Sequence, residues 1–229
     1  WILFLTSSGT VASHQKISST QGGFTGALGD DDRFGTSVSA LGDLNGDGVP
    51  DLAVGAPQDD DGGSSIGEHG VDQGAVWILF LNSDGTVKGH QKISATEGGF
   101  GGYAEMFRFG NKLTALGDLD GGGEPELAVG VYVDNDGGND YGAVWILFLN
   151  SDGTVKGHQK ISATQGGFSG TLEEKDHFGG SVADLGDLDG DGLPELAVGA
   201  RRDDDGGVHP DDKGAVYVLD LQQSACPAT

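Results

Sequence analysis

The chain repeats itself, and this repetition constrains its fold more than any other feature of the sequence. The segment from Val76 to Thr96 recurs without a change from Val144 to Thr164, and a near copy runs from Trp1 to Thr20. The Gly-Ala pair that precedes the segment recurs at spacings of 68 and then 72 residues, at Gly74, Gly142 and Gly214. A period of this size indicates a supersecondary unit repeated along the chain.

Each unit predicts four short strands, because no stretch carries a 3.6-residue apolar period long enough for a helix. The first strand is expected within residues 34–44, 109–119 and 178–188, and the second within 51–56, 126–131 and 195–200. The third is the apolar run after each Gly-Ala pair, and the fourth is the Val-Lys-Gly-His-Gln-Lys-Ile-Ser segment. Continuous apolar runs suit strands that are covered on both faces, as in blades that stack on one another.

A short motif at the first two strands resembles a known family. Phe34-Gly35 followed by Gly55-Ala56-Pro57 is similar to the FG-GAP repeat of integrin α-subunit β-propellers and of many secreted bacterial proteins. Phe109-Gly110 and Phe178-Gly179 open looser versions of the motif. The resemblance implies an all-β fold of propeller-type blades, each of four antiparallel strands. We expect repeats over residues 1–221, in units at 1–33 (partial), 34–108, 109–177 and 178–221, and a C-terminal tail at 222–229.

The loop between the first and second strands carries oxygen side chains at alternating positions. In the first complete unit, loop positions one, three, five and nine are Asp43, Asn45, Asp47 and Asp51, and the carbonyl of Val49 stands at position seven. Ca²⁺ takes six to eight oxygen ligands, and the intervening glycines permit the tight backbone curl that brings alternate residues inward. An EF-hand loop begins in the same way but needs an acidic residue at position twelve, where this loop has Val54. The FG-GAP calcium loop is therefore the better interpretation.

The other two units vary this loop. The third repeats it in full, with Asp187, Asp189, Asp191, the Leu193 carbonyl and Glu195 as expected ligands. The middle unit keeps Asp118, Asp120 and Glu126 but has Gly122 at position five. Loss of one carboxylate lowers both the ligand count and the charge that tune calcium affinity, so we expect a weaker or vacant site in this loop.

A second acidic cluster follows the second strand of each unit, in Asp59-Asp60-Asp61, Asp134-Asn135-Asp136 and Asp203-Asp204-Asp205. Two glycines follow each cluster, so a further cation site and a solvated turn are both open interpretations. Catalytic motifs are lacking in the sequence, and the recurring His14, His90 and His158 are expected to have a structural role in the fourth strand. We therefore predict a protein that is not an enzyme.

The charge of the chain excludes some partners. With 36 acidic residues against 12 basic ones, the formal net charge is -24, which repels nucleic acid and anionic membrane surfaces. The sequence has no apolar run long enough for membrane insertion and a single cysteine, Cys226, which rules out an internal disulfide framework. Clustered carboxylates repel one another, so we expect bound cations to neutralise their charge.

The number of units does not decide between a single propeller and an assembly of several chains. Propellers close with four to eight blades, whereas this chain begins and ends within a blade, which predicts either a piece of a longer propeller or self-association through unpaired terminal strands. The leading hypothesis is an extracellular or cell-surface calcium-binding module for structure or adhesion, acting on an unknown protein or surface ligand. The alternatives are a self-assembling filament subunit, a non-catalytic propeller attached to a hydrolase domain outside this chain, and a lectin.

Overall fold

The protein is all-β in the computed structural model, which describes residues 1–60, 72–101, 108–204 and 212–222. Thirteen strands and no helix occur within these ranges, so the described residues offer no helix that could span a bilayer. Cys226 and the predicted tail, apart from Gln222, lie outside the described residues, as do Asp61 and Asp205 of the second acidic clusters.

The strands form antiparallel sheets in chain order. One four-stranded sheet contains β3 (Ser37–Gly42), β4 (Asp51–Ala56), β5 (Ala75–Leu81) and β6 (Val87–Ile93). The next contains β7 (Lys112–Ala115), β8 (Leu127–Val131), β9 (Ala143–Leu149) and β10 (Val155–Ile161). A three-stranded sheet follows with β11 (Phe178–Asp184), β12 (Glu195–Ala200) and β13 (Ala215–Asp220), and β1 (Ile2–Leu5) pairs with β2 (Val11–Gln15) in a separate hairpin. The predicted four-stranded propeller blades are confirmed, and the sheets do not close into a ring.

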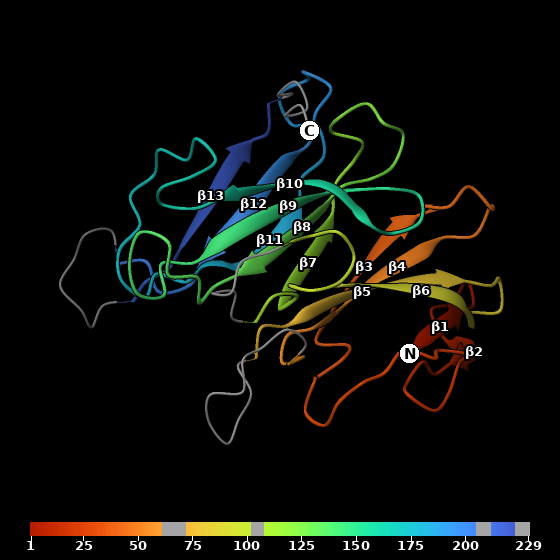
Figure 1. Cartoon of the computed structure of the whole chain (residues 1–229). Coiled ribbons are helices and arrows are strands. Elements are labelled where there is room, and N and C mark those ends of the chain that lie inside the picture. The colour runs from red at the N-terminus through yellow and green to blue at the C-terminus, as the bar shows by residue number, and fades with distance from the viewer. Residues whose placement is uncertain (61–71, 102–107, 205–211, 223–229) are drawn as a thin grey trace.

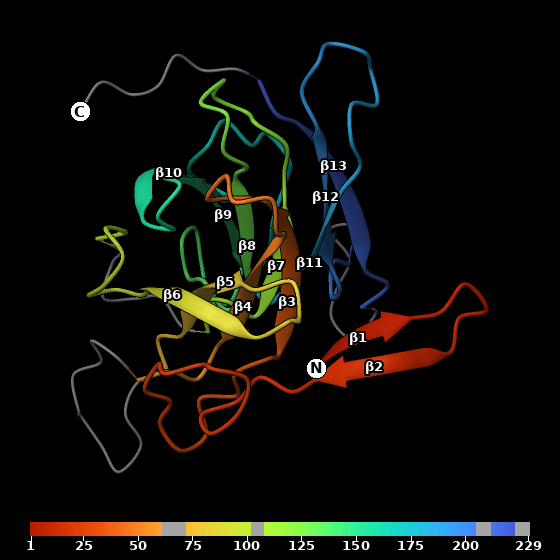
Figure 2. The same cartoon turned by 90° about the vertical axis from the view of Figure 1, so that its right-hand side faces the viewer.

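Neighbouring sheets stack side by side, and this stacking buries the apolar strands (Figures 1 and 2). Val76 of β5 and Val144 of β9 are fully buried, whereas Val216, at the same position of β13, is 71% exposed. β5 and β9 are each paired on both sides and covered by the next blade, whereas β13 is the edge strand of its sheet and no further blade covers it among the described residues. Single parallel bridges join successive blades, one from Gly74 to Phe109 and one from Gly142 to Phe178.

The first strand of a blade is shorter than the sequence predicts. β3 begins at Ser37, after a turn at Gly35 (φ 93°), and not at Phe34, whereas β11 of the third blade begins at Phe178 as predicted. The N–H of Gly35 donates to the carbonyl oxygen of Gly55, so this turn is fixed to the second strand of the same blade. The strand also ends early, at Gly42 (φ 69°), where the acidic loop begins.

The glycine that begins the Gly-Ala-Pro part of the motif lies where two blades meet. A Cβ atom on Gly55 would collide with the carbonyl oxygen of Gly110 in the next blade and with the hydroxyl of Ser37. The Ser37 hydroxyl itself donates to that Gly110 carbonyl at 2.6 Å. The close approach of the two backbones therefore requires the absence of a side chain at residue 55.

We predict that Gly55→Ala separates the two blades and lowers the free energy of unfolding by about 1–3 kcal/mol, the usual cost of overpacking. Urea unfolding measures this change. Gly117→Ala is the matched control, because a Cβ atom there meets nothing within 4 Å and the backbone φ is not positive. Equal loss of stability in the two variants would contradict the close-approach role of Gly55.

Candidate metal sites

Each acidic loop is fixed to the core by the acidic residue at its ninth position. The backbone N–H of the residue at position two donates to this carboxylate in all three blades: Leu44 to Asp51 at 3.2 Å, Leu119 to Glu126 at 2.6 Å and Leu188 to Glu195 at 2.5 Å. Asp51 and Glu195 begin the second strand and Glu126 directly precedes it, and all three acids are at most 3% exposed. The sequence thus places a buried carboxylate at the junction of each loop with its sheet.

Burial of these carboxylates is not fully compensated by hydrogen bonds. Burial raises the pKa of Asp51 although the N–H groups of Leu81 and Leu44 oppose this effect, and burial raises the pKa of Glu126 to about 7 against the hydrogen bond from Leu119. Oε1 of Glu126 and Oε1 of Glu195 are buried and accept no hydrogen bond from the described residues. A buried carboxylate oxygen without a donor is costly, and a bound cation is one way to satisfy it.

The structure brings many of the predicted ligands together. The carboxylates of Asp118, Asp120 and Glu126 have ligand atoms within 4.8 Å of one another, and so do those of Asp187, Asp189 and Asp191. These sets fit a hard divalent cation because carboxylate oxygens are the ligands that Ca²⁺ prefers. The first loop, although described throughout, does not bring three carboxylates this close.

The backbone of the first loop nevertheless curls around its first ligand. Asp43 accepts hydrogen bonds from the N–H groups of Asp47 (2.9 Å) and Gly48 (2.7 Å). Asn45 accepts from Asp47 and Asp47 accepts from Val49, so alternate side chains turn inward along the loop. The third loop repeats this pattern, with Asp187 accepting from Gly190 and Gly192.

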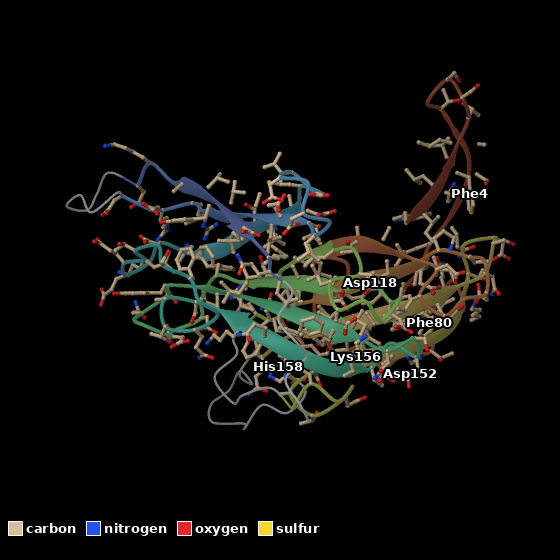
Figure 3. All side chains as sticks on the ribbon, turned by 90° about the horizontal axis from the view of Figure 1, so that it is seen from above. Phe4, Phe80, Asp118, Asp152, Lys156 and His158 are labelled. Carbon is tan, nitrogen blue, oxygen red and sulfur yellow. The ribbon has the colours of Figure 1, made fainter. Side chains whose placement is uncertain are left out.

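A lysine from the fourth strand lies against the acidic loop in both four-stranded blades. Lys88 of β6 forms an ion pair with Asp47. Lys156 of β10, which is labelled in Figure 3, lies 2.9 Å from Asp120 and 3.9 Å from Glu124. The middle loop, which lacks a carboxylate at position five, thus has an ammonium group beside its remaining acids. Sequence reasoning did not identify these lysines, although both stand at the same place in the repeated fourth strand.

Asp220 is a further acidic residue that the sequence analysis missed. It lies opposite Glu195 in the register of β12 and β13, and the ligand atoms of Asp189, Glu195 and Asp220 lie within 4.8 Å of one another. Alignment of the three repeats would have revealed it, because the equivalent residues of the other blades are Phe80 and Phe148.

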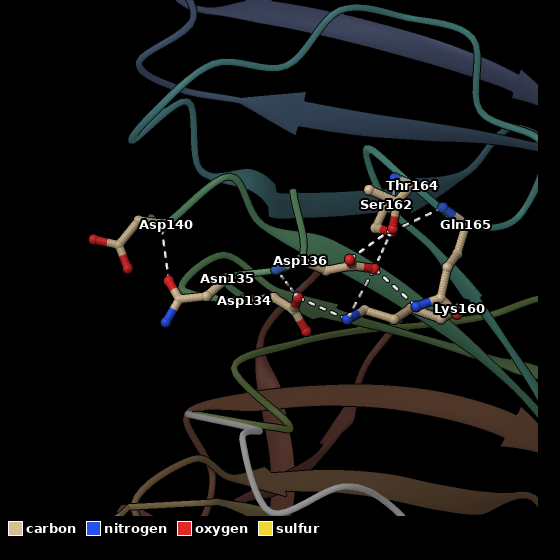
Figure 4. A network of polar contacts seen from close by, with 8 residues as sticks. All are labelled: Asp134, Asn135, Asp136, Asp140, Lys160, Ser162, Thr164 and Gln165. Carbon is tan, nitrogen blue, oxygen red and sulfur yellow. Dashed lines mark hydrogen bonds and ion pairs between the residues drawn. The ribbon is translucent and has the colours of Figure 1, made fainter. Parts of the chain in front are cut away.

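The second acidic cluster of the middle blade is held by protein donors (Figure 4). Asp136 accepts hydrogen bonds from the side chains of Ser162 (2.7 Å), Thr164 (2.6 Å) and Gln165 (2.8 Å), and Lys160 lies 3.4 Å away. Although burial opposes it, these hydrogen bonds and the Lys160 charge lower the pKa of Asp136 to about 2. This arrangement favours the structural turn over a cation site in this blade.

The corresponding clusters of the other blades also contact protein groups. Lys92 of β6 lies 2.9 Å from Asp59, and the hydroxyl of Tyr217 donates to Asp203. Asp59 and Asp203 are buried, so both turns are joined to the strands of their own blade.

The recurring histidines and tryptophans pack against each other. His158 lies 5.3 Å from Trp145 and 5.0 Å from Phe100, measured between ring centroids, and His90 contacts Trp77 and Phe24 in the same way. Burial lowers the pKa of His158. Trp77 and Trp145 are at most 4% exposed, so their faces are not available as a platform for sugar stacking.

Comparison with known proteins agrees with the motif and the blades. The family model described as "FG-GAP repeat" matches residues 34–79 and 179–219. The chain is 35% identical to integrin alpha-PS2 of Drosophila melanogaster over 75% of its own length, and 35% identical to integrin alpha-5 of Xenopus laevis over 73% and to human integrin alpha-7 over 74%. It spans only 12 to 14% of the length of these relatives.

We predict that Asp136→Asn destabilises the protein near neutral pH, because an amide offers one acceptor oxygen where the carboxylate receives several donors. The expected loss is about 1 kcal/mol, since the side chain is partly exposed to screening by water. A carboxylate whose pKa is lower in the folded state stabilises the fold above its unfolded pKa and loses this effect as pH falls through the folded value. The difference in unfolding free energy should therefore shrink between about pH 4 and pH 2.

Urea unfolding of both proteins at a series of pH values and constant ionic strength measures this difference. Asp140→Asn is the control, because it removes a charge from the same loop, and Asp140 joins the network of Figure 4 through its backbone N–H, which donates to Asn135. A gap between wild type and Asp136→Asn that stays constant from pH 4 to pH 2 would contradict the role of the ionised carboxylate.

Proposed function

Because the chain is an FG-GAP repeat protein similar to integrin α-subunits, we propose that it is an extracellular, calcium-stabilised module that acts in structure or adhesion and has no catalytic role. The observation that carries the proposal is the anchored acidic loop, repeated in three blades with a buried carboxylate at its base. The relatives are named as integrins, and the proposal extends their adhesion class to this chain on the strength of the shared repeats.

Calcium has a structural role in this proposal. Asp43, Asn45, Asp47, the Val49 carbonyl and Asp51 would hold one ion, and Asp187, Asp189, Asp191, the Leu193 carbonyl and Glu195 another. A bound divalent ion neutralises charge that otherwise accumulates in a chain of net charge -24, and it links each loop to the start of the second strand. The middle loop, with Asp118, Asp120 and Glu126, is proposed to bind calcium more weakly because Gly122 supplies no ligand and Lys156 already pairs with Asp120.

The other hypotheses gain less support. For a lectin, Trp77 and Trp145 are buried and offer no ring face to a sugar, whereas Trp1 at the same repeat position is 71% exposed. Self-association through unpaired strands, a filament and an attached hydrolase domain stay predictions.

We predict that calcium raises the melting temperature and that a chelator reverses the effect. Saturation of one loop at 100 times its Kd adds about 2.7 kcal/mol, which corresponds to roughly 5–10 °C for a chain of this size. Asp43→Asn and Asp187→Asn should each remove the gain that their own loop provides, and the double variant nearly all of the calcium effect. Differential scanning calorimetry in calcium and in EGTA measures the effect.

Glu174→Gln is the matched control, since it removes one exposed acidic charge that lies outside the three loops. It should keep the full calcium gain. A melting temperature of the unmodified protein that is the same in calcium and in EGTA would exclude a stabilising metal.

A further inference from the structure

The third blade carries an acidic residue where the other two blades carry phenylalanine. Asp220 of β13 corresponds to Phe80 of β5 and Phe148 of β9. In the antiparallel register, Glu195 at the start of β12 stands directly opposite Asp220. The exchange therefore places a carboxylate beside the buried acid at the base of the loop.

Three carboxylates converge at this point. The ligand atoms of Asp189, Glu195 and Asp220 lie within 4.8 Å of one another. Glu195 is 3% exposed, and its Oε1 accepts no hydrogen bond from the described residues, while its Oε2 is occupied by the N–H of Leu188. A desolvated carboxylate oxygen next to two further carboxylates is unfavourable unless a cation lies among them.

The third loop also differs from the other two in its basic neighbours. In the four-stranded blades, Lys88 and Lys156 bring an ammonium group to Asp47 and Asp120. Among the residues that the structure describes, no ion pair reaches the acids of the third loop. The loop thus combines five acidic side chains with no ammonium competitor, at Asp187, Asp189, Asp191, Glu195 and Asp220.

We propose that Asp220 is an additional ligand of a divalent cation in the third loop, and that this loop consequently binds calcium more tightly than the other two. Asp220 reaches the ion from the third strand, outside the nine-residue loop. Together with the four acidic loop residues and the Leu193 carbonyl it provides six ligand residues, which meets the minimum coordination number of Ca²⁺ without water. The proposal rests on the proposed function, because it requires that the loop binds calcium.

Isothermal titration of metal-free protein with calcium chloride tests the proposal. Asp220→Asn keeps the size of the side chain and removes its charge, and Asp220→Phe restores the residue found in the other two blades. We expect both variants to weaken the tightest class of sites by about tenfold or more, since calcium affinity follows ligand charge and number. Glu174→Gln, which removes one exposed acidic charge outside the three loops, should change this Kd by less than about twofold, in line with screening of exposed charges.

The melting temperature provides a second readout that a purely structural role would not produce. In EGTA, Asp220→Asn should leave the melting temperature unchanged or raise it, because it relieves repulsion with Glu195 and Asp189. In calcium, the same variant should gain less stability than the unmodified protein. A variant that is less stable in EGTA and gains as much from calcium as the unmodified protein would overturn the ligand role.

The two proposals fail in different ways. If Asp187→Asn abolishes the tightest class of sites and Asp220→Asn leaves its Kd unchanged, the loop binds calcium and Asp220 is not a ligand. If the unmodified protein and Asp187→Asn give the same titration, the third loop binds no calcium, and both proposals are overturned for this blade.

Discussion

The buried carboxylate at the start of the second strand is the feature on which the rest of each blade depends. Asp51, Glu126 and Glu195 lie between the acidic loop and the core, and each receives the N–H of the second loop residue. This bond holds the loop above the sheet, but it leaves a negative charge in a desolvated place. The other acidic residues of the loop add to that charge. The arrangement that orders the loop is therefore favourable only when a positive group lies nearby.

The three blades surround this carboxylate with different groups although their strands are nearly identical. Asp51 accepts a second backbone N–H, from Leu81, whereas the glutamates at the same position keep a buried oxygen without a donor. The middle loop receives Lys156, and the third loop receives a further carboxylate from Asp220. Asp220, which replaces a phenylalanine of the other blades, therefore adds a negative charge beside a loop whose own sequence is almost unaltered.

Repeats and spacing predicted the strands and the loop positions well. The second and third strands were recognised because stacked blades cover both of their faces, as the burial of Val76 and Val144 shows. β3 was predicted to begin too early, because the turn at Gly35 depends on a hydrogen bond to Gly55 in another strand. Lys156 and Asp220 were missed for a related reason. Their distances to the loops follow from sheet register across many residues, and the loop motif alone does not contain that information.

An anomalous difference map from crystals grown in calcium tests most directly whether the anchored acidic loops are cation sites. Two calcium peaks are expected, one enclosed by Asp43, Asp47 and Asp51 and the other by Asp187, Asp189 and Glu195. The middle loop should show the Lys156 ammonium group beside Asp120 in place of a strong peak. Crystals that contain millimolar calcium and show no anomalous peak in either the first or the third loop would contradict the assignment.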